Sequence, residues 1–355
     1  MHEKKGMGLT EPSHLTVHPA AVASIIIPTY DRPDDLRECL ANLTQQTPPV
    51  PVEIVIADNH PESGQTAAVV AAFPGVVLVE ETRAGISYAR NAAILAATGR
   101  LLIAIDDDVI PPPGFIDCVL AQFDDPEVDV VTGNVIPFKL ETDAERLFEK
   151  YNPLGRGHDP VKFDAAWFRS FHLRSVPAHY TGVGANWACR REVLADPHVG
   201  LFNEVLGAGS PTGTADDTYM FYRILHAGYT IHYEPSVWVW HKHRSSLESL
   251  RQQLHNHTKG MIAFEIETFL NDGDWRGLLQ LFVRLPAWRT LEMVRELSRM
   301  LRGHKSDYWW LLWLYIGAEI EGPVAWWRSR QRVKHLGRSG QLSTQQYTNA
   351  PQLTV

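Results

Sequence analysis

The 355-residue sequence contains little cysteine and no long apolar run, and each shortage excludes a class of protein. Its three cysteines, Cys39, Cys118 and Cys189, are far apart and odd in number, so they predict neither a disulfide framework nor a cysteine metal site. Such sparse thiols suit a reducing compartment, and we expect a cytoplasmic protein. The longest apolar stretch, residues 308–318, is too short to cross a bilayer upright, so no transmembrane helix is expected.

Positive charge is also in short supply. The 33 Lys and Arg residues face 41 Asp and Glu residues, which gives a formal net charge of -8. A surface of this sign does not attract nucleic acid as a whole, and we expect no nucleic-acid partner. The first twenty residues lack the apolar core of a signal peptide. We expect flexible tails at residues 1–20 and 339–355.

Glycine is missing from the turn that follows the first apolar run, where residues 28–35 read PTYDRPDD. A nicotinamide-dependent oxidoreductase would need a glycine-rich fingerprint there. A sugar nucleotidyltransferase would usually carry a glycine-rich, basic phosphate loop at the same point. The sequence therefore argues strongly against the oxidoreductase and leaves the nucleotidyltransferase as an alternative.

Strand and helix patterns alternate along the first third of the chain. Short apolar runs predict strands at residues 24–28, 53–57, 76–79 and 101–105. Helices are predicted from Pro33, with Asp31 as a plausible cap, and over residues 85–98. This alternation indicates an α/β fold with a mainly parallel sheet. We expect a domain at 21–245, followed by a helical extension at 246–338 that is rich in tryptophan and basic residues.

Acids or turn residues follow three of the predicted strands, at residues 28–31, 58–59 and 106–108. In parallel sheets, ligands bind beyond the carboxyl ends of the strands. Asp106, Asp107 and Asp108 repel one another, and a hard divalent cation such as Mg²⁺ or Mn²⁺ would supply the counter-charge. In a strand, Asp106 and Asp108 would point the same way. The alternative for the triplet alone is a solvated acidic turn.

Four segments, in this order, resemble family 2 glycosyltransferases. They are SIIIPTYDRPDDLRECLANL, EIVIADN, GISYARNAAILAATGRLLIAIDDDVIPPPGFI and ADDTYMFYRILHAGY, and the resemblance covers residues 23–244. It implies a GT-A fold, a Rossmann-like mixed sheet flanked by helices. It also implies inverting transfer from a nucleoside-diphosphate sugar, most often a UDP-sugar, to a hydroxyl of a saccharide or lipid-linked acceptor. Envelope polysaccharide or glycolipid synthesis would fit, and the alternative is a degenerate nucleotide-sugar-binding protein.

The resemblance assigns a set of residues to the sugar nucleotide. They are Pro28, Thr29, Tyr30, Asp31, Asp58, Asn59, Arg90, Asn91, Asp106, Asp107, Gly184 and Asn186. Arg90 would pair with phosphate through its planar fork, unless it forms a structural salt bridge. Asp58 and Asn59 would otherwise be a simple turn, and so would the loop that holds Gly184.

The same resemblance assigns metal and catalytic roles. Asp106 and Asp108 match the family's DxD pair, and His241 matches a histidine near the metal, which would be Mn²⁺ or Mg²⁺. Asp216 and Asp217 match an acidic pair whose second member is the general base. The alternative is that both acids cap the helix that follows them.

The C-terminal part is aromatic and basic. Its tryptophans are Trp288, Trp309, Trp310, Trp313, Trp326 and Trp327, and five Lys and Arg residues follow between 328 and 338. This combination suits peripheral contact of residues 305–338 with the inner face of the plasma membrane. The alternatives are tryptophans that pack on the catalytic core and a homo-oligomer contact.

Overall fold

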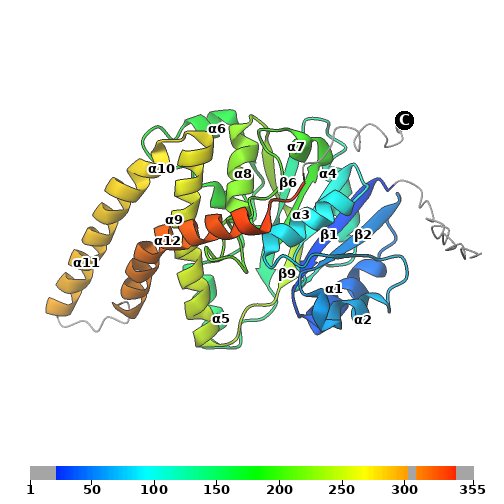
Figure 1. The fold of residues 1–355 in the computed structure, drawn as a ribbon, viewed down its shortest axis with the longest axis horizontal. Helices are drawn as coiled ribbons and strands as arrows, with labels where there is room; N and C mark the ends of the chain where they lie inside the picture. The colour runs from blue at the N-terminus through cyan, green and yellow to red at the C-terminus, as the bar shows by residue number, and fades with distance from the viewer. Residues whose placement is uncertain (1–20, 303–308, 341–355) are drawn as a thin grey trace, which may run out of the picture.

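The computed structural model describes residues 21–302 and 309–340, and in this part of the chain nine strands form one twisted sheet (Figure 1). The strands are β1 (Ala23–Thr29), β2 (Val52–Asp58), β3 (Val77–Glu80), β4 (Leu101–Ile105), β5 (Val109–Ile110), β6 (Val130–Pro137), β7 (Val161–Phe163), β8 (Asn186–Arg190) and β9 (Ile231–His241). They lie in the order β3-β2-β1-β4-β8-β6-β9-β5, with β7 paired to β9. The four strands predicted from the sequence are therefore confirmed to within two residues.

The sheet is mixed. β1 pairs in parallel with β2 and β4, and β2 with β3. β8 then runs antiparallel to both β4 and β6, while β6 and β9 are parallel. The order in which strands are added to the sheet thus reverses at β1, with β2 on one side and β4 on the other. In α/β sheets, ligands bind at such a switch point.

Helices cover both faces of the sheet. The helices are α1 (Pro33–Thr44), α2 (Gln65–Val70), α3 (Ile86–Ala96), α4 (Phe115–Gln122), α5 (Asp143–Tyr151), α6 (Ala165–Arg169), α7 (Arg191–Ala195), α8 (Asp216–His226), α9 (Leu247–Asp272), α10 (Arg276–Leu279), α11 (Leu285–Leu301) and α12 (Trp309–Leu336). Short 3₁₀ turns occur at Pro61–Ser63 and Ala178–Tyr180, and a π-helical turn at Gln280–Arg284. One apolar core joins the sheet to α1, α2 and α4, and another joins it to α3, α8 and α9. The predicted α/β sheet flanked by helices is confirmed.

Helix α1 shows how the sequence positions this framework. Its apolar residues Leu36, Cys39, Leu40 and Leu43 recur at helical spacing, and all are buried. Pro33 occupies the first turn, as predicted. The predicted cap was wrong, because the cap position belongs to Arg32. Asp31 instead has a left-handed backbone, with φ 51°, and its carboxylate lies 2.7 Å from Nδ1 of His60.

The C-terminal helices form an extension that returns to the sheet. Helix α12 crosses the front of the molecule in Figure 1 and ends beside α3. There the Tyr88 hydroxyl donates to the Gly337 carbonyl at 2.8 Å, and the Ser329 hydroxyl donates to the Val205 carbonyl at 2.6 Å. Trp326 packs against the core and donates to Glu267 at 2.6 Å, as the core-packing alternative predicted, whereas Trp288, Trp310, Trp313 and Trp327 are exposed. Among the described helices, none combines the length and apolarity that a membrane crossing requires.

The domain boundary at residue 245 stays a prediction. The two predicted tails fall almost wholly on residues 1–20 and 341–355, which lie outside the described residues. Helix α9 belongs to the predicted extension, yet it packs on α8 and α12 as part of the main core. The extension and the sheet domain are thus joined by a shared core.

Glu265 on α9 gives a test of this shared core. Burial raises the pKa of its carboxyl from about 4.5 to about 8, and Oε2 finds no hydrogen-bond partner within the described parts of the chain. A raised folded pKa stabilises the fold below the unfolded pKa, and that stability is lost as pH rises through the folded pKa. Between pH 5 and pH 9 the free energy of unfolding of the parent should fall by up to about 4 kcal/mol because of this group, and Glu265→Gln should remove that loss. Urea unfolding of parent and variant at pH 5 and pH 9 measures this difference. An equal change of unfolding free energy with pH in the two proteins would contradict the prediction.

Candidate functional site

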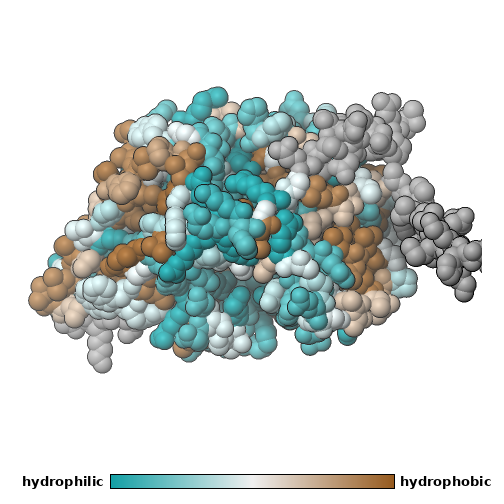
Figure 2. Space-filling model, viewed as in Figure 1, coloured by the Kyte–Doolittle hydropathy of each residue, from teal (hydrophilic) through white to brown (hydrophobic). Residues whose placement is uncertain are grey.

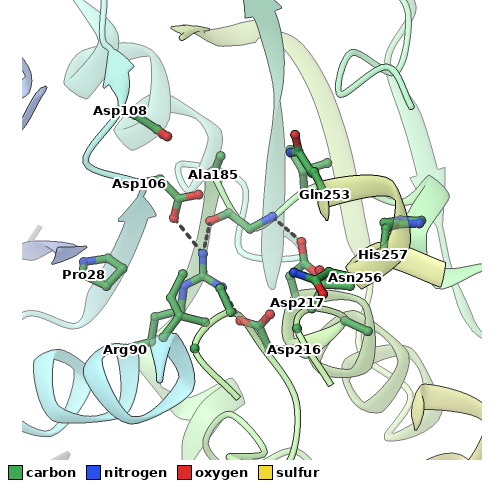
Figure 3. A pocket seen from close by; sticks show the side chains of 18 of the residues that line it. Pro28, Arg90, Asp106, Asp108, Ala185, Asp216, Asp217, Gln253, Asn256 and His257 are labelled. Carbon is green, nitrogen blue, oxygen red and sulfur yellow. Dashed lines mark hydrogen bonds and ion pairs between the residues drawn. The ribbon is translucent and has the colours of Figure 1, made fainter. Parts of the chain in front are cut away.

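A cavity of about 720 Å³ opens at the carboxyl ends of β1, β2 and β4. Twelve of the residues predicted from the sequence line it, and Figure 3 shows several of them facing one another. They are Pro28, Thr29, Tyr30, Asn59, Arg90, Asp106, Asp107, Asp108, Gly184, Asp216, Asp217 and His241. Four other predicted residues, Asp31, Asp58, Asn91 and Asn186, are not part of the lining.

The predicted meeting of three strand ends is confirmed by hydrogen bonds between them. At the end of β1, the Thr29 hydroxyl donates to the Asp107 carboxylate at 2.7 Å. After β2, the backbone amide of Asn59 donates to the Thr29 carbonyl at 2.9 Å. Tyr30 remains 53% exposed, and its ring stacks on that of His60 with centroids 5.1 Å apart. This stacked pair offers an aromatic face on which a flat base could lie.

The acidic triplet is arranged differently from the prediction. β4 ends at Ile105, and Asp106 to Asp108 form a turn before β5, so the alternation of side chains along a strand does not apply. Asp107 is buried, and burial together with the Asp108 charge raises its pKa to about 7. Arg32, which the sequence analysis missed, donates to Asp107 at 3.1 Å and to Asp108 at 2.5 Å. Arg32 stands four residues after the apolar run at 24–28, and this position in the loop after a strand could have marked it as a site residue.

Asp108 and His241 form the part of the site that best suits a cation. Nε2 of His241 lies 3.3 Å from Oδ1 of Asp108, in a contact that lacks hydrogen-bond geometry. That buried oxygen therefore has no hydrogen-bond partner among the residues described. Burial disfavours both charged forms, but their mutual attraction raises the pKa of His241 and, with Arg32, lowers that of Asp108. A carboxylate oxygen beside an imidazole is a donor set that Mn²⁺ accepts.

Asp106, the third predicted metal ligand, is engaged elsewhere. Its carboxylate accepts from Arg90 at 2.7 Å, and Figure 3 shows it turned toward that guanidinium. Within the described ranges no three His, Cys, Asp or Glu side chains are gathered into a ready metal site. Mg²⁺ and Mn²⁺ sites in nucleotide enzymes often use few protein ligands and complete their shell with water and phosphate oxygens. Asp108 and His241 fit that pattern, and Asp106 would first have to leave Arg90.

Arg90 forms the structural salt bridge that the sequence analysis held as an alternative. It is buried, and it donates to Asp216 at 2.5 Å as well as to Asp106. Burial opposes its charge, but these two acids hold its pKa above the ordinary value. Burial in turn raises the pKa of Asp216 to about 6. The prediction that Arg90 binds phosphate is not supported by this arrangement, because the guanidinium is already shared between two carboxylates.

Asp217 stands at the start of α8 and faces the cavity. Oδ2 accepts from the Gly184 amide at 2.8 Å, and Oδ1 accepts from the Thr218 amide at 2.6 Å. The cap position itself is Ala215, at φ 75°, but both acids lie in the first turn of α8, where the helix-start alternative expected them. Gly184 permits this approach, since a Cβ there would lie 3.0 Å from Cβ of Asp217 and 2.9 Å from Nη2 of Arg90. The loop that holds Gly184 therefore fixes both side chains.

The remaining predicted residues support loops. Asn91 donates to the Phe202 carbonyl at 2.9 Å, and Asn186 donates to two backbone carbonyls at 3.0 Å. The Asp58 carboxylate accepts from the His60 amide at 3.0 Å, and Asn59 bonds the backbone at residues 81, 83 and 85. For Asn91 and Asn186 the structure replaces the predicted ligand contact with a structural one, because their amides are already used by buried backbone.

A second wall of the cavity was missed from the sequence. It comes from two other parts of the chain, and its polar residues are Arg156, His179, Gln252, Gln253, Asn256 and His257. Burial lowers the pKa of His179 to about 4 and also lowers that of His257, so both imidazoles are neutral near pH 7. The polar residues of α9 recur at i and i+4, a helical stripe that could have been read from the sequence.

Comparisons with known proteins place this chain in a family. Residues 24–196 match the family model described as Glycosyl transferase family 2. An uncharacterized glycosyltransferase, YwdF of Bacillus subtilis, is 31% identical over 43% of this chain and 67% of its own length. Glycosyltransferase AglE of Haloferax volcanii is 26% identical over 65% of this chain and 70% of its own. Pre-mycofactocin glycosyltransferase of Mycobacterium tuberculosis is 25% identical over 66% of this chain, and the match spans only 44% of that protein.

The fold is shared with a solved structure. A mannosyltransferase, PcManGT from Pyrobaculum calidifontis, in complex with GDP-Man and Mn²⁺, superposes with a TM-score of 0.54. The sequences are 18% identical, and the match covers 86% of this chain and 88% of that one. At this identity the likeness concerns the fold alone.

Proposed function

The chain belongs to glycosyl transferase family 2, and on that premise we propose that it moves a sugar from a nucleoside diphosphate to an acceptor hydroxyl. One observation carries the proposal. Asp217, held by the Gly184 amide, faces the same cavity as the acidic turn and the aromatic face of Tyr30. A carboxylate that could act as a base and an aromatic ring that could carry a nucleotide thus line one cavity.

The donor would lie across the ends of β1, β2 and β4. Tyr30 would stack on its base, and Thr29 and Asn59 already fix the loop on which Tyr30 stands. Asp217 would take the proton from the acceptor oxygen as that oxygen attacks the anomeric carbon. Both carboxylate oxygens accept backbone hydrogen bonds, but each keeps a lone pair for this task. Attack from the face opposite the diphosphate would invert the anomeric centre.

A divalent cation would act on the leaving group. Asp108 and His241 would hold Mn²⁺ or Mg²⁺, which would supply positive charge for a diphosphate leaving group. Arg32 also supplies positive charge to Asp107 and Asp108. The buried Asp108 oxygen that faces His241 supports this assignment, because no hydrogen bond from the described residues satisfies it.

The acceptor would occupy the second wall. Neutral imidazoles of His179 and His257 and the amides of α9 donate and accept hydrogen bonds without adding charge. Such groups suit the hydroxyls of a saccharide, either free or lipid-linked. Arg156 would add one cation for an acidic group on the acceptor.

A donor screen tests the proposal. Purified protein is incubated with UDP-, GDP- and dTDP-sugars with Mn²⁺ or Mg²⁺, and release of the nucleoside diphosphate is measured with and without a panel of saccharides. We expect one donor class to be consumed, and thermal stability to rise with that nucleotide as its free concentration rises. A rise in stability without turnover would identify a degenerate binding protein. No response to any activated sugar would end the proposal.

A further inference from the structure

The helical hairpin at the end of the chain carries a large exposed apolar surface. Figure 1 places α11 at the opposite end of the molecule from β1 and β2, and Figure 2 shows hydrophobic surface over that end. We call this surface the hairpin face. Its members are Phe282, Val283, Trp288, Leu291, Val294, Leu297, Leu301 and Trp313, all exposed, with Phe282, Trp288 and Leu301 at 74%, 60% and 81%. A gathered patch of this kind marks an interaction site, unlike scattered apolar residues.

The hairpin face has a basic border. Exposed Arg284, Arg295, Arg299 and Arg302 lie on the same segment, and Arg299 is paired with Glu296. Residues 276–302 contain six Lys and Arg against two Asp and Glu, while the whole chain is at -8. This segment is thus at +4 and the rest of the chain at -12. This polarity would turn the hairpin face toward an anionic surface, because charges on the distant body are screened beyond about 10 Å.

We propose that the hairpin face docks on an anionic lipid surface. Leu291, Val294, Leu297 and Leu301 form one broad face of α11, and Trp288 and the arginines lie at its border. An apolar helix face with aromatic and basic flanks is the pattern of helices that lie in the plane of a membrane interface. Contact with lipid goes beyond the proposed sugar transfer and does not depend on it.

This surface differs from the one that the sequence predicted. The basic end of α12 turns back to the sheet domain, where Ser329 and Val333 are buried and Arg332 lies beside Gly85. Residues 305–308 of the predicted stretch lie outside the described residues. The apolar residues that face solvent belong mainly to α11 and the π-helical turn before it. We therefore assign the membrane contact to α11 and not to the end of α12.

A second copy of the chain is the competing occupant. Two copies joined through the hairpin face would bring two sets of arginines together, which like-charge repulsion opposes. Anionic headgroups would neutralise the same arginines. The charge pattern therefore favours lipid.

Vesicle sedimentation of the full chain, without donor or metal, tests the proposal. Vesicles of equal parts phosphatidylglycerol and phosphatidylcholine should bind it, and binding should weaken with salt. Phe282→Ser with Trp288→Ser should lower the partition coefficient about tenfold or more, since two large apolar side chains leave the interface. Arg295→Glu with Arg302→Glu should lower it by a similar factor. The control is Val161→Ser with Leu173→Ser, which removes two exposed apolar residues of the sheet domain and should leave binding unchanged.

Three results would overturn the proposal. One is no binding to the anionic vesicles at low salt. Another is a loss of binding in the control equal to the loss in the hairpin variant. The third is a parent chain that sediments as a dimer, with the hairpin variant monomeric and neither bound to vesicles, which would assign the face to self-association. Sugar transfer in the donor screen is a separate readout, so failure of one proposal leaves the other standing.

Discussion

Asp217→Asn is expected to lower sugar transfer by about 10²–10⁴-fold while the protein still binds its donor nucleotide. The amide keeps the size of the carboxylate but cannot take a proton from the acceptor hydroxyl. The donor contacts of the proposal lie on β1, β2 and β4, across the cavity from Asp217. A loss confined to turnover, with thermal stabilisation by the nucleotide retained, would therefore place Asp217 in the chemical step.

The substitution also changes two hydrogen bonds, and the experiment has to separate that effect. Both oxygens of Asp217 accept from backbone amides, and an Asn side chain can satisfy only one of them. We expect a stability loss of about 1–2 kcal/mol, which unfolding at the assay temperature would reveal. Asp143→Asn is a matched control, because Asp143 also lies in the first turn of a helix and is exposed to solvent. Normal turnover by Asp217→Asn would remove the residue from the role of base.

The framework of the site could be predicted from local sequence patterns. Buried strands ended where apolar runs ended, and parallel pairing then forced Thr29, Asn59 and the acidic turn together. Motif order identified the residues at these ends and the Asp217 helix. These features depend on short sequence segments and on the general geometry of parallel sheets, so one sequence is enough to predict them.

The partners of the charged side chains could not be predicted in the same way. Arg90 pairs with Asp216, 126 positions away, and Arg32 pairs with Asp108, 76 positions away. Both pairings depend on the loops after β1 and before α8, whose left-handed residues Asp31 and Ala215 have no clear sequence signal. The polar stripe of α9 is visible in the sequence, but its place in the second wall is not. Only tertiary packing brings His257 to the cavity that holds Asp217.

Asp108→Asn is expected to weaken metal-dependent binding of the donor nucleotide by about 100-fold or more. The side chain keeps its shape, but it loses the anionic oxygen that faces His241 and has no hydrogen-bond partner in the described structure. With EDTA, variant and parent should bind the nucleotide alike, because neither then uses the cation. Calorimetric titration of the nucleoside diphosphate with and without Mn²⁺ measures the difference, and the electron spin resonance signal of free Mn²⁺ reports metal binding without turnover.

Asp107→Asn supplies the matched control in the same turn. The Asp107 carboxylate is held by the Thr29 hydroxyl and by Arg32, so its loss should reduce stability by about 1 kcal/mol and leave most of the Mn²⁺ dependence. If Asp107→Asn abolished the response to Mn²⁺ and Asp108→Asn did not, the cation would belong to the other carboxylate. If neither variant changed it, the acidic turn would serve only as an anionic partner for Arg32 and Arg90. In that case the leaving diphosphate would need these arginines, released from their carboxylates, as its source of positive charge.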